Sequence, residues 1–125
     1  MDLELTGTCA LVTGSSSGIG VGIARMLMGE GVRVVVTGRN AGRAEAVAAM
    51  LRNEGGEVVA VVGDLSSDEE AAAVAAGATA AFGGIDILVN NAGGGTASEN
   101  RGWFGTTADD WLASYERNTI SAVRM

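Results

Sequence analysis

The sequence predicts one α/β domain, spanning residues 1–125, that is built on a parallel β-sheet. Four short apolar runs are bounded by turn residues, at 9–14, 32–38, 57–64 and 85–93. Their β-branched residues and their lack of alternation are typical of strands that are covered on both faces. The segments between them have the length of helices, at about 18–30, 41–54 and 67–82. Right-handed crossovers place such helices on both faces of the sheet.

Composition excludes several classes of function. The formal charge of −7 and the sequence pI of about 4.4 predict no general attraction to nucleic acid or to an anionic membrane. No apolar run approaches the ~20 residues of a membrane helix. One cysteine, Cys9, and an N-terminus without the features of a signal peptide favour a cytoplasmic location. The absence of histidine argues against a metal site.

The helices after the third strand carry start signals. Ser67 and Glu70 have the spacing of a capping box. A fourth helix is expected from near Thr107, with Asp110 three positions on, and it continues to Met125. Three of its apolar residues fall on roughly one face, namely Trp111, Leu112 and Tyr115. No glycine or proline ends this helix, so we expect that it is interrupted at Met125.

Glycines are concentrated where the first strand turns into the first helix. Such a turn brings backbone N–H groups and the positive end of the helix dipole to one point, which makes a phosphate site. A side chain there would keep a pyrophosphate away from the backbone, or would block close packing of the helix on the strand. The spacing of Gly14, Gly18 and Gly20 differs from GxGxxG, but TGSSSGIG at 13–20 matches the pattern TGxxxGIG in full.

With these motifs the chain resembles the short-chain dehydrogenase/reductase superfamily, in particular the main group that includes the 3-oxoacyl-[acyl-carrier-protein] reductases. The likeness covers the entire chain, from ALVTGSSSGIG through VVVTGRN, GDLS and IDILVNNAG to DDWLASYERNTISAVRM. The resemblance implies a doubly wound, Rossmann-type parallel sheet with strand order 3-2-1-4. It also implies NAD(H) or NADP(H) as the cofactor.

The same resemblance assigns the phosphate and ribose contacts. Ser15, Ser16, Ser17 and Ile19 would form the turn between the glycines and offer N–H and hydroxyl groups to the pyrophosphate and the adenosine ribose. Alternatively, the serines are present only because serine suits turns. The NNAG segment would tie neighbouring strands together and pass close to the cofactor ribose, and its contact residues are Asn91, Ala92 and Gly93.

Two further positions concern the adenosine end of the cofactor. Asp64 would accept a hydrogen bond from the adenine amino group, assisted by the backbone of Leu65; alternatively, Asp64 caps the next helix. Gly38 stands where an acidic residue would bind the ribose 2′-hydroxyl of NAD, and Arg39 follows it. Because a guanidinium pairs with a 2′-phosphate, we expect NADP(H) to be favoured over NAD(H), with Arg43 either in support or simply solvated.

The resemblance further implies hydride transfer assisted by a tyrosine acid, a lysine, a carbonyl-binding serine and an asparagine that orders a water. Only the asparagine is found, at Asn118, although an isolated asparagine there would also suit a helix surface. Tyr115 is followed four positions on by Thr119, and the chain has no lysine. Ser114 and Ser121 lie in a helix. We therefore expect a cofactor-binding half, truncated before the catalytic serine and YxxxK segments, with an exposed fourth strand.

Three functional hypotheses stay open at this point. The first is the N-terminal part of an NADPH-dependent reductase acting on a small carbonyl or alcohol compound. The second is a non-catalytic dinucleotide-binding module, and the third is an inactive remnant. Trp103 and Phe104 would either face a substrate or cover the loop that contains them. The resemblance and the fourth helix favour a homo-oligomer.

Overall fold

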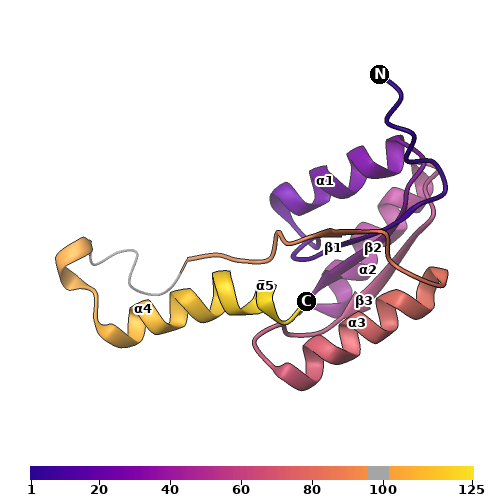
Figure 1. Cartoon of the computed structure of the whole chain (residues 1–125). Helices are drawn as coiled ribbons and strands as arrows, with labels where there is room; N and C mark the ends of the chain where they lie inside the picture. The colour runs from indigo at the N-terminus through magenta and orange to yellow at the C-terminus, as the bar shows by residue number, and fades with distance from the viewer. Residues whose placement is uncertain (96–101) are drawn as a thin grey trace.

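The computed structural model describes residues 1–95 and 102–125 and shows a parallel sheet between helices (Figure 1). The strands are β1 (Cys9–Val12), β2 (Arg33–Gly38), β3 (Val58–Val62) and β4 (Ile87–Val89). Their order in the sheet is β3-β2-β1-β4, and every pairing is parallel. The predicted fold class and strand order are therefore confirmed.

Helices α1 (Gly18–Gly29), α2 (Ala41–Asn53) and α3 (Asp68–Phe82) cover the sheet on its two faces. Successive residues of a strand point to opposite faces, so each strand contributes to two cores. One face packs on α1 and α2 through a buried cluster: Ala10, Val12, Ala24, Val34, Val36, Ala48 and Leu51. The other face packs on α3, where Leu11 and Val35 meet Ala78. The continuous apolar strands of the sequence reflect this double coverage.

The start of α3 differs from the predicted capping box. The Ser67 hydroxyl accepts a hydrogen bond from the N–H of Glu70 at 3.3 Å, as expected. The Glu70 carboxylate, however, accepts from the N–H of Asp64 at 2.6 Å and not from that of Ser67. The reciprocal half of the predicted box is wrong, because the N–H of Ser67 already donates to the carbonyl of Asp64 at 3.2 Å.

The fourth strand is shorter than predicted and lies at one edge of the sheet. Only Ile87–Val89 pairs with β1. Asp86 precedes it and accepts a hydrogen bond from the N–H of Cys9 at 2.8 Å, which fixes the start of the pair. Leu88 is 41% exposed, as an apolar residue on an open edge would be.

The C-terminal helical segment extends from the body of the domain and returns to it at its C-terminal end (Figure 1). Helix α4 (Ala108–Tyr115) begins with a full capping box between Thr107 and Asp110. A π-helical turn (Glu116–Ile120) and the short α5 (Ser121–Val123) follow it. The predicted apolar face is exposed at Trp111, Leu112 and Tyr115. None of the described helices is both long and apolar enough to cross a membrane.

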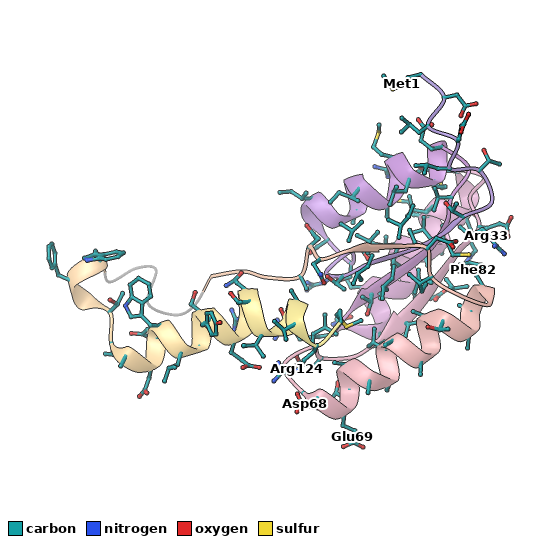
Figure 2. The ribbon with its side chains drawn as sticks, viewed as in Figure 1. Met1, Arg33, Asp68, Glu69, Phe82 and Arg124 are labelled. Carbon is teal, nitrogen blue, oxygen red and sulfur yellow. The ribbon has the colours of Figure 1, made fainter. Side chains whose placement is uncertain are left out.

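Arg124 fastens the end of this segment to the domain. Its Nε donates to the Asp68 carboxylate at 2.5 Å, and its Nη1 donates to the Leu65 carbonyl at 3.0 Å and to Glu116 (Figure 2). The Arg124 side chain is only 17% exposed, and these partners raise its pKa further above the usual range. The helix that carries Asn118 is thereby held beside the carboxyl ends of the strands.

Candidate functional site

A cleft of about 900 Å³ lies where the strands end and the helices begin. Its size matches that of small-molecule and cofactor sites, which reach about 1,000 Å³. It is lined by most of the residues that the sequence singled out: Gly14, Ser16, Ser17, Gly18, Ile19, Gly20, Arg39, Asp64, Leu65, Asn91, Ala92 and Gly93. Ser15 and Asn118 do not line it. The carboxyl edge of a parallel sheet is where ligands bind in this architecture.

The three motif positions require glycine for different physical reasons. Gly14 has a φ of +62°, and a Cβ there would lie 2.8 Å from the Cα of Ala92. A Cβ on Gly20 would lie 2.5 Å from the carbonyl oxygen of Gly14. Gly18 has a φ of +55° but nothing within 4 Å of its Cβ position. Gly14 and Gly20 therefore permit close packing, whereas Gly18 permits the turn and leaves open space on the cleft side.

The N-terminus of α1 is uncapped by any side chain. Ser17 occupies the N-cap position, yet its side chain accepts no hydrogen bond from the helix, and the first turn contains no acidic residue. By contrast, Asn40, Ser67 and Thr107 each cap the helix that follows them. The first N–H groups of a helix need acceptors, and a bound anion can provide them. The open end of α1 lies in the cleft.

Ser15 is placed differently from its prediction. The residue is fully buried, and its hydroxyl donates to the carbonyl of Val12 at 2.6 Å and accepts from the N–H of Thr37 at 2.9 Å. Its own N–H donates to the Thr37 carbonyl at 2.9 Å. Ser15 thus joins the end of β1 to the end of β2, and its hydroxyl has no access to a ligand in the cleft.

Thr13, which the sequence reasoning missed, joins β1 to the segment after β4. Its hydroxyl accepts hydrogen bonds from the N–H groups of Asn91 at 3.0 Å and Ala92 at 2.9 Å. The Asn91 amide donates in return to the carbonyls of Thr13 and Gly14 at 3.0 and 3.1 Å. The expected strand tie through an asparagine amide is present. The threonine before the first motif glycine was the available signal.

Asp64 lies half-buried just after the end of β3 and lines the cleft. Its Oδ1 accepts a hydrogen bond from the N–H of Ser66 at 2.9 Å. This bond, with a smaller contribution from the nearby cations Arg39 and Arg117, lowers the pKa of the Asp64 carboxyl. Ser67, rather than Asp64, caps α3. The alternative capping role of Asp64 is therefore wrong.

Arginines outnumber carboxylates in the lining of this cleft by three to two, because Asp64 and Glu116 also line it. Arg39, Arg43 and Arg117 all line it. Within residues 1–95 and 102–125, Arg39 and Arg43 form no ion pair, whereas Arg25, Arg52 and Arg124 do. Arg117 donates to the carbonyl of Gly95. Arg117 was not predicted, because its position before Asn118 in a helix carries no signal in a single sequence.

Asn118 holds the loop after β4 in place. Its Oδ1 accepts from the N–H of Gly94, and its Nδ2 donates to the Gly94 carbonyl, both at 3.0 Å. A Cβ on Gly93 would lie 2.5 Å from Asn118 Oδ1. Asn118 belongs to the π-helical turn Glu116–Ile120, a distortion that is frequent at functional sites. Residues 96–101 of the expected substrate loop lie outside the described residues, and Trp103 and Phe104 are exposed.

A dinucleotide fits the residues that line the cleft. The first N–H groups of α1 have no side-chain acceptor and lie in the cleft, so phosphate oxygens would satisfy them. Open space beside Gly18 allows a phosphate to approach the backbone. The unpaired Arg39 provides a cation at the end of β2. These groups would hold the phosphates and the adenosine ribose of a nucleotide cofactor.

The parallel 3-2-1-4 sheet and the glycine turn at its carboxyl edge define a nucleotide-binding domain of the Rossmann type. Residues 8–125 match the family model described as short chain dehydrogenase. The chain belongs to the short-chain dehydrogenase family.

Two curated relatives illustrate the match. The 7alpha-hydroxysteroid dehydrogenase of Escherichia coli (strain K12) is 38% identical over 120 residues, which make up 96% of this chain and 46% of the relative. The 2,3-dihydroxy-2,3-dihydro-p-cumate dehydrogenase of Pseudomonas putida is 34% identical, over 97% of this chain and 46% of the relative. The chain thus spans about half the length of the curated relatives it matches.

Solved structures agree with the fold. A 7 alpha-hydroxysteroid dehydrogenase complexed with NADH and 7-oxo glycochenodeoxycholic acid has a TM-score of 0.88 at 37% identity, covering 98% of this chain and 47% of that one. L-sorbose reductase from Gluconobacter frateurii, complexed with NADPH and L-sorbose, has a TM-score of 0.85 at 37% identity. The match covers 99% of this chain and 46% of that one. Both cofactors occur among these structures. The expected likeness to 3-oxoacyl-[acyl-carrier-protein] reductases in particular stays a prediction.

Gly20 and Gly22 form a matched pair for testing the glycine turn. Gly20→Ala places a Cβ 2.5 Å from the carbonyl oxygen of Gly14 and 2.7 Å from the Cα of Ser15, so we expect it to lower the free energy of unfolding by about 1–3 kcal/mol. Gly22→Ala meets nothing within 4 Å and should raise it by about 0.5–1 kcal/mol through helix propensity. Urea unfolding measures both variants. Equal effects would contradict the conclusion that close packing requires glycine at position 20 but not at position 22.

The lowered pKa of Asp64 makes a prediction about acid stability. The ionised form is favoured by the folded state, so its contribution is present above the unfolded pKa of about 3.9 and is lost as pH falls through the lower folded pKa. Asp64→Asn keeps an acceptor for Ser66 but removes the charge. Urea unfolding should show a less stable variant at pH 6, with the difference from wild type shrinking below about pH 4. A difference independent of pH would contradict this assignment.

Proposed function

We propose that the protein containing this chain is an NADP(H)-dependent oxidoreductase that interconverts a small carbonyl compound and the corresponding alcohol. The observation that carries this proposal is the uncapped N-terminus of α1, which opens into a cleft that arginines also line. The cofactor would supply or accept the hydride. This chain would bind and orient the cofactor.

The phosphates are assigned to the turn between β1 and α1. The free N–H groups at the start of α1 and the helix dipole favour a pyrophosphate. No acidic side chain in the first turn competes for these groups or repels an anion. Ser16 and Ser17 line the same cleft, whereas the buried Ser15 contributes only through the position it gives the turn.

The preference for NADP(H) over NAD(H) is argued from the end of β2. Gly38 provides no carboxylate to bind a ribose 2′-hydroxyl or to repel a 2′-phosphate. Arg39 follows it with an exposed guanidinium that has no ion pair among the described residues. Such a guanidinium can form two parallel charge-assisted hydrogen bonds with a phosphate. Since the solved relatives include complexes with both cofactors, this preference is argued only from Gly38 and Arg39 of this chain.

At the adenine end, Asp64 would accept a hydrogen bond from the adenine amino group, and the backbone of Leu65 would assist it. At the other end, Asn91 would keep the segment 90–93 close to the cofactor, because its amide is bonded to Thr13 and Gly14. Asn118 would act by fixing Gly94 beside the reacting end. The assignment of these residues to a cofactor is part of the proposal.

The proton-transfer residues are assigned to the part of the protein that these 125 residues do not include. Tyr115 does not line the cleft, and no lysine is available to it. The relatives are about twice as long as this chain, which leaves room for a catalytic serine, tyrosine and lysine. The alternative is a module that binds the dinucleotide without turnover.

Arg39→Asp tests the proposal, with Arg25→Asp as a control that makes the same change in charge on an exposed helix surface outside the cleft. Loss of the phosphate contact should lower the NADPH/NADH affinity ratio about 10- to 100-fold, whereas Arg25→Asp should leave the ratio unchanged. Isothermal titration measures binding, and NADPH oxidation by the natural protein with carbonyl compounds measures turnover. An unchanged ratio in Arg39→Asp would sink the cofactor assignment, and binding without turnover would support the module instead.

A further inference from the structure

The side chain of Ser16 occupies the space beside Gly38. A Cβ added to Gly38 would lie 2.3 Å from Ser16 Oγ and 2.8 Å from Ser16 Cβ. Both distances are below 3.0 Å, which real Cβ atoms essentially never show. A hydroxyl can rotate away from such a contact, but a Cβ moves only with its backbone. Any residue larger than glycine at position 38 therefore requires Ser16 to be displaced.

The backbone of Ser16 has little freedom to move. The preceding residue, Ser15, is fully buried and bonded twice to Thr37, through its N–H and through its hydroxyl, both at 2.9 Å. Thr37 is the neighbour of Gly38 in β2. The turn that contains Ser16 and the strand end that contains Gly38 are therefore held together by the two hydrogen bonds between the preceding residues, Ser15 and Thr37. A side chain at position 38 would have to distort these two hydrogen bonds.

Gly38 is not required by backbone conformation. Gly14 and Gly18 have positive φ values, and Gly38 does not. It ends a regular strand with ladder partners in β3, a conformation that any residue adopts. The contact with Ser16 is therefore the reason that the structure gives for a glycine at this position.

We propose that Ser16 is a specificity-determining residue that keeps position 38 free of side chains. The inference rests on the proposed function, in which position 38 is where a carboxylate would select NAD(H). With Ser16 present, that carboxylate cannot be accommodated, and Arg39 remains the charged group at the end of β2. A change of preference toward NAD(H) would then need two substitutions, one at position 38 and one that removes the Ser16 side chain.

Thermal unfolding without cofactor tests the contact by itself. Gly38→Ala should lower Tm by at least about 4 °C, and Ser16→Gly in the same chain should recover most of that loss. Ser16→Ala should not recover it, because the Cβ at 2.8 Å remains. Gly42→Ala is the matched control, since its nearest contact is an ordinary 3.5 Å. Additive effects of Gly38→Ala and Ser16→Gly, or a Gly38→Ala variant as stable as wild type, would overturn the inference.

Isothermal titration with NADPH and NADH tests the consequence for specificity. We expect Gly38→Asp alone to weaken binding of both, and Gly38→Asp with Ser16→Gly to raise the NADH/NADPH affinity ratio at least tenfold over wild type. A single Gly38→Asp variant that changes the ratio as much as the double variant would overturn the inference. Wild-type protein that binds neither dinucleotide would instead refute the proposed function. The unfolding measurements would still test the contact between Ser16 and position 38.

Discussion

The cleft depends on the hydrogen bonds that the Thr13 hydroxyl accepts from the backbone of Asn91 and Ala92. These bonds bring the segment after β4 against the glycine turn, so closely that Gly14 has no room for a Cβ. Ser15 makes the equivalent connection toward β2. Three strands therefore end at one place with their backbones fixed, and the turn between them holds α1 with its first N–H groups free. Short polar side chains, buried and fully paired, achieve this without filling the cleft.

Electrostatics then separates this place from the rest of the molecule. The chain carries a net charge of −7, and much of its positive charge outside the cleft is paired or packed, as with Arg124 on Asp68 and Arg33 against Phe82 (Figure 2). Arg39 and Arg43 instead have no ion pair among the described residues. In the proposed function, the open helix N-terminus and these guanidinium groups would attract the phosphates of one dinucleotide, although the overall charge of the chain would repel an anion.

Much of the fold was predictable from the sequence, because apolar runs, caps and the TGxxxGIG motif are local signals. The strand order came from family resemblance. Several details were not predictable because they depend on contacts between distant segments. Glu70 has the spacing of a capping box, yet its carboxylate accepts from the N–H of Asp64, because the N–H of Ser67 donates to the carbonyl of Asp64. Ser15 and Ser16 are adjacent and chemically identical, but one is buried between strands and the other lines the cleft. Only the packing of β2 against the turn distinguishes them.

The central claim is that the open N-terminus of α1 holds the phosphates of a dinucleotide. The most direct test is a crystal structure of the natural protein with NADP⁺ bound. The account predicts pyrophosphate oxygens within hydrogen-bond distance of backbone N–H groups in the first turn of α1, and the 2′-phosphate beside Arg39. A dinucleotide bound elsewhere, or one whose phosphates avoid this turn, would contradict it.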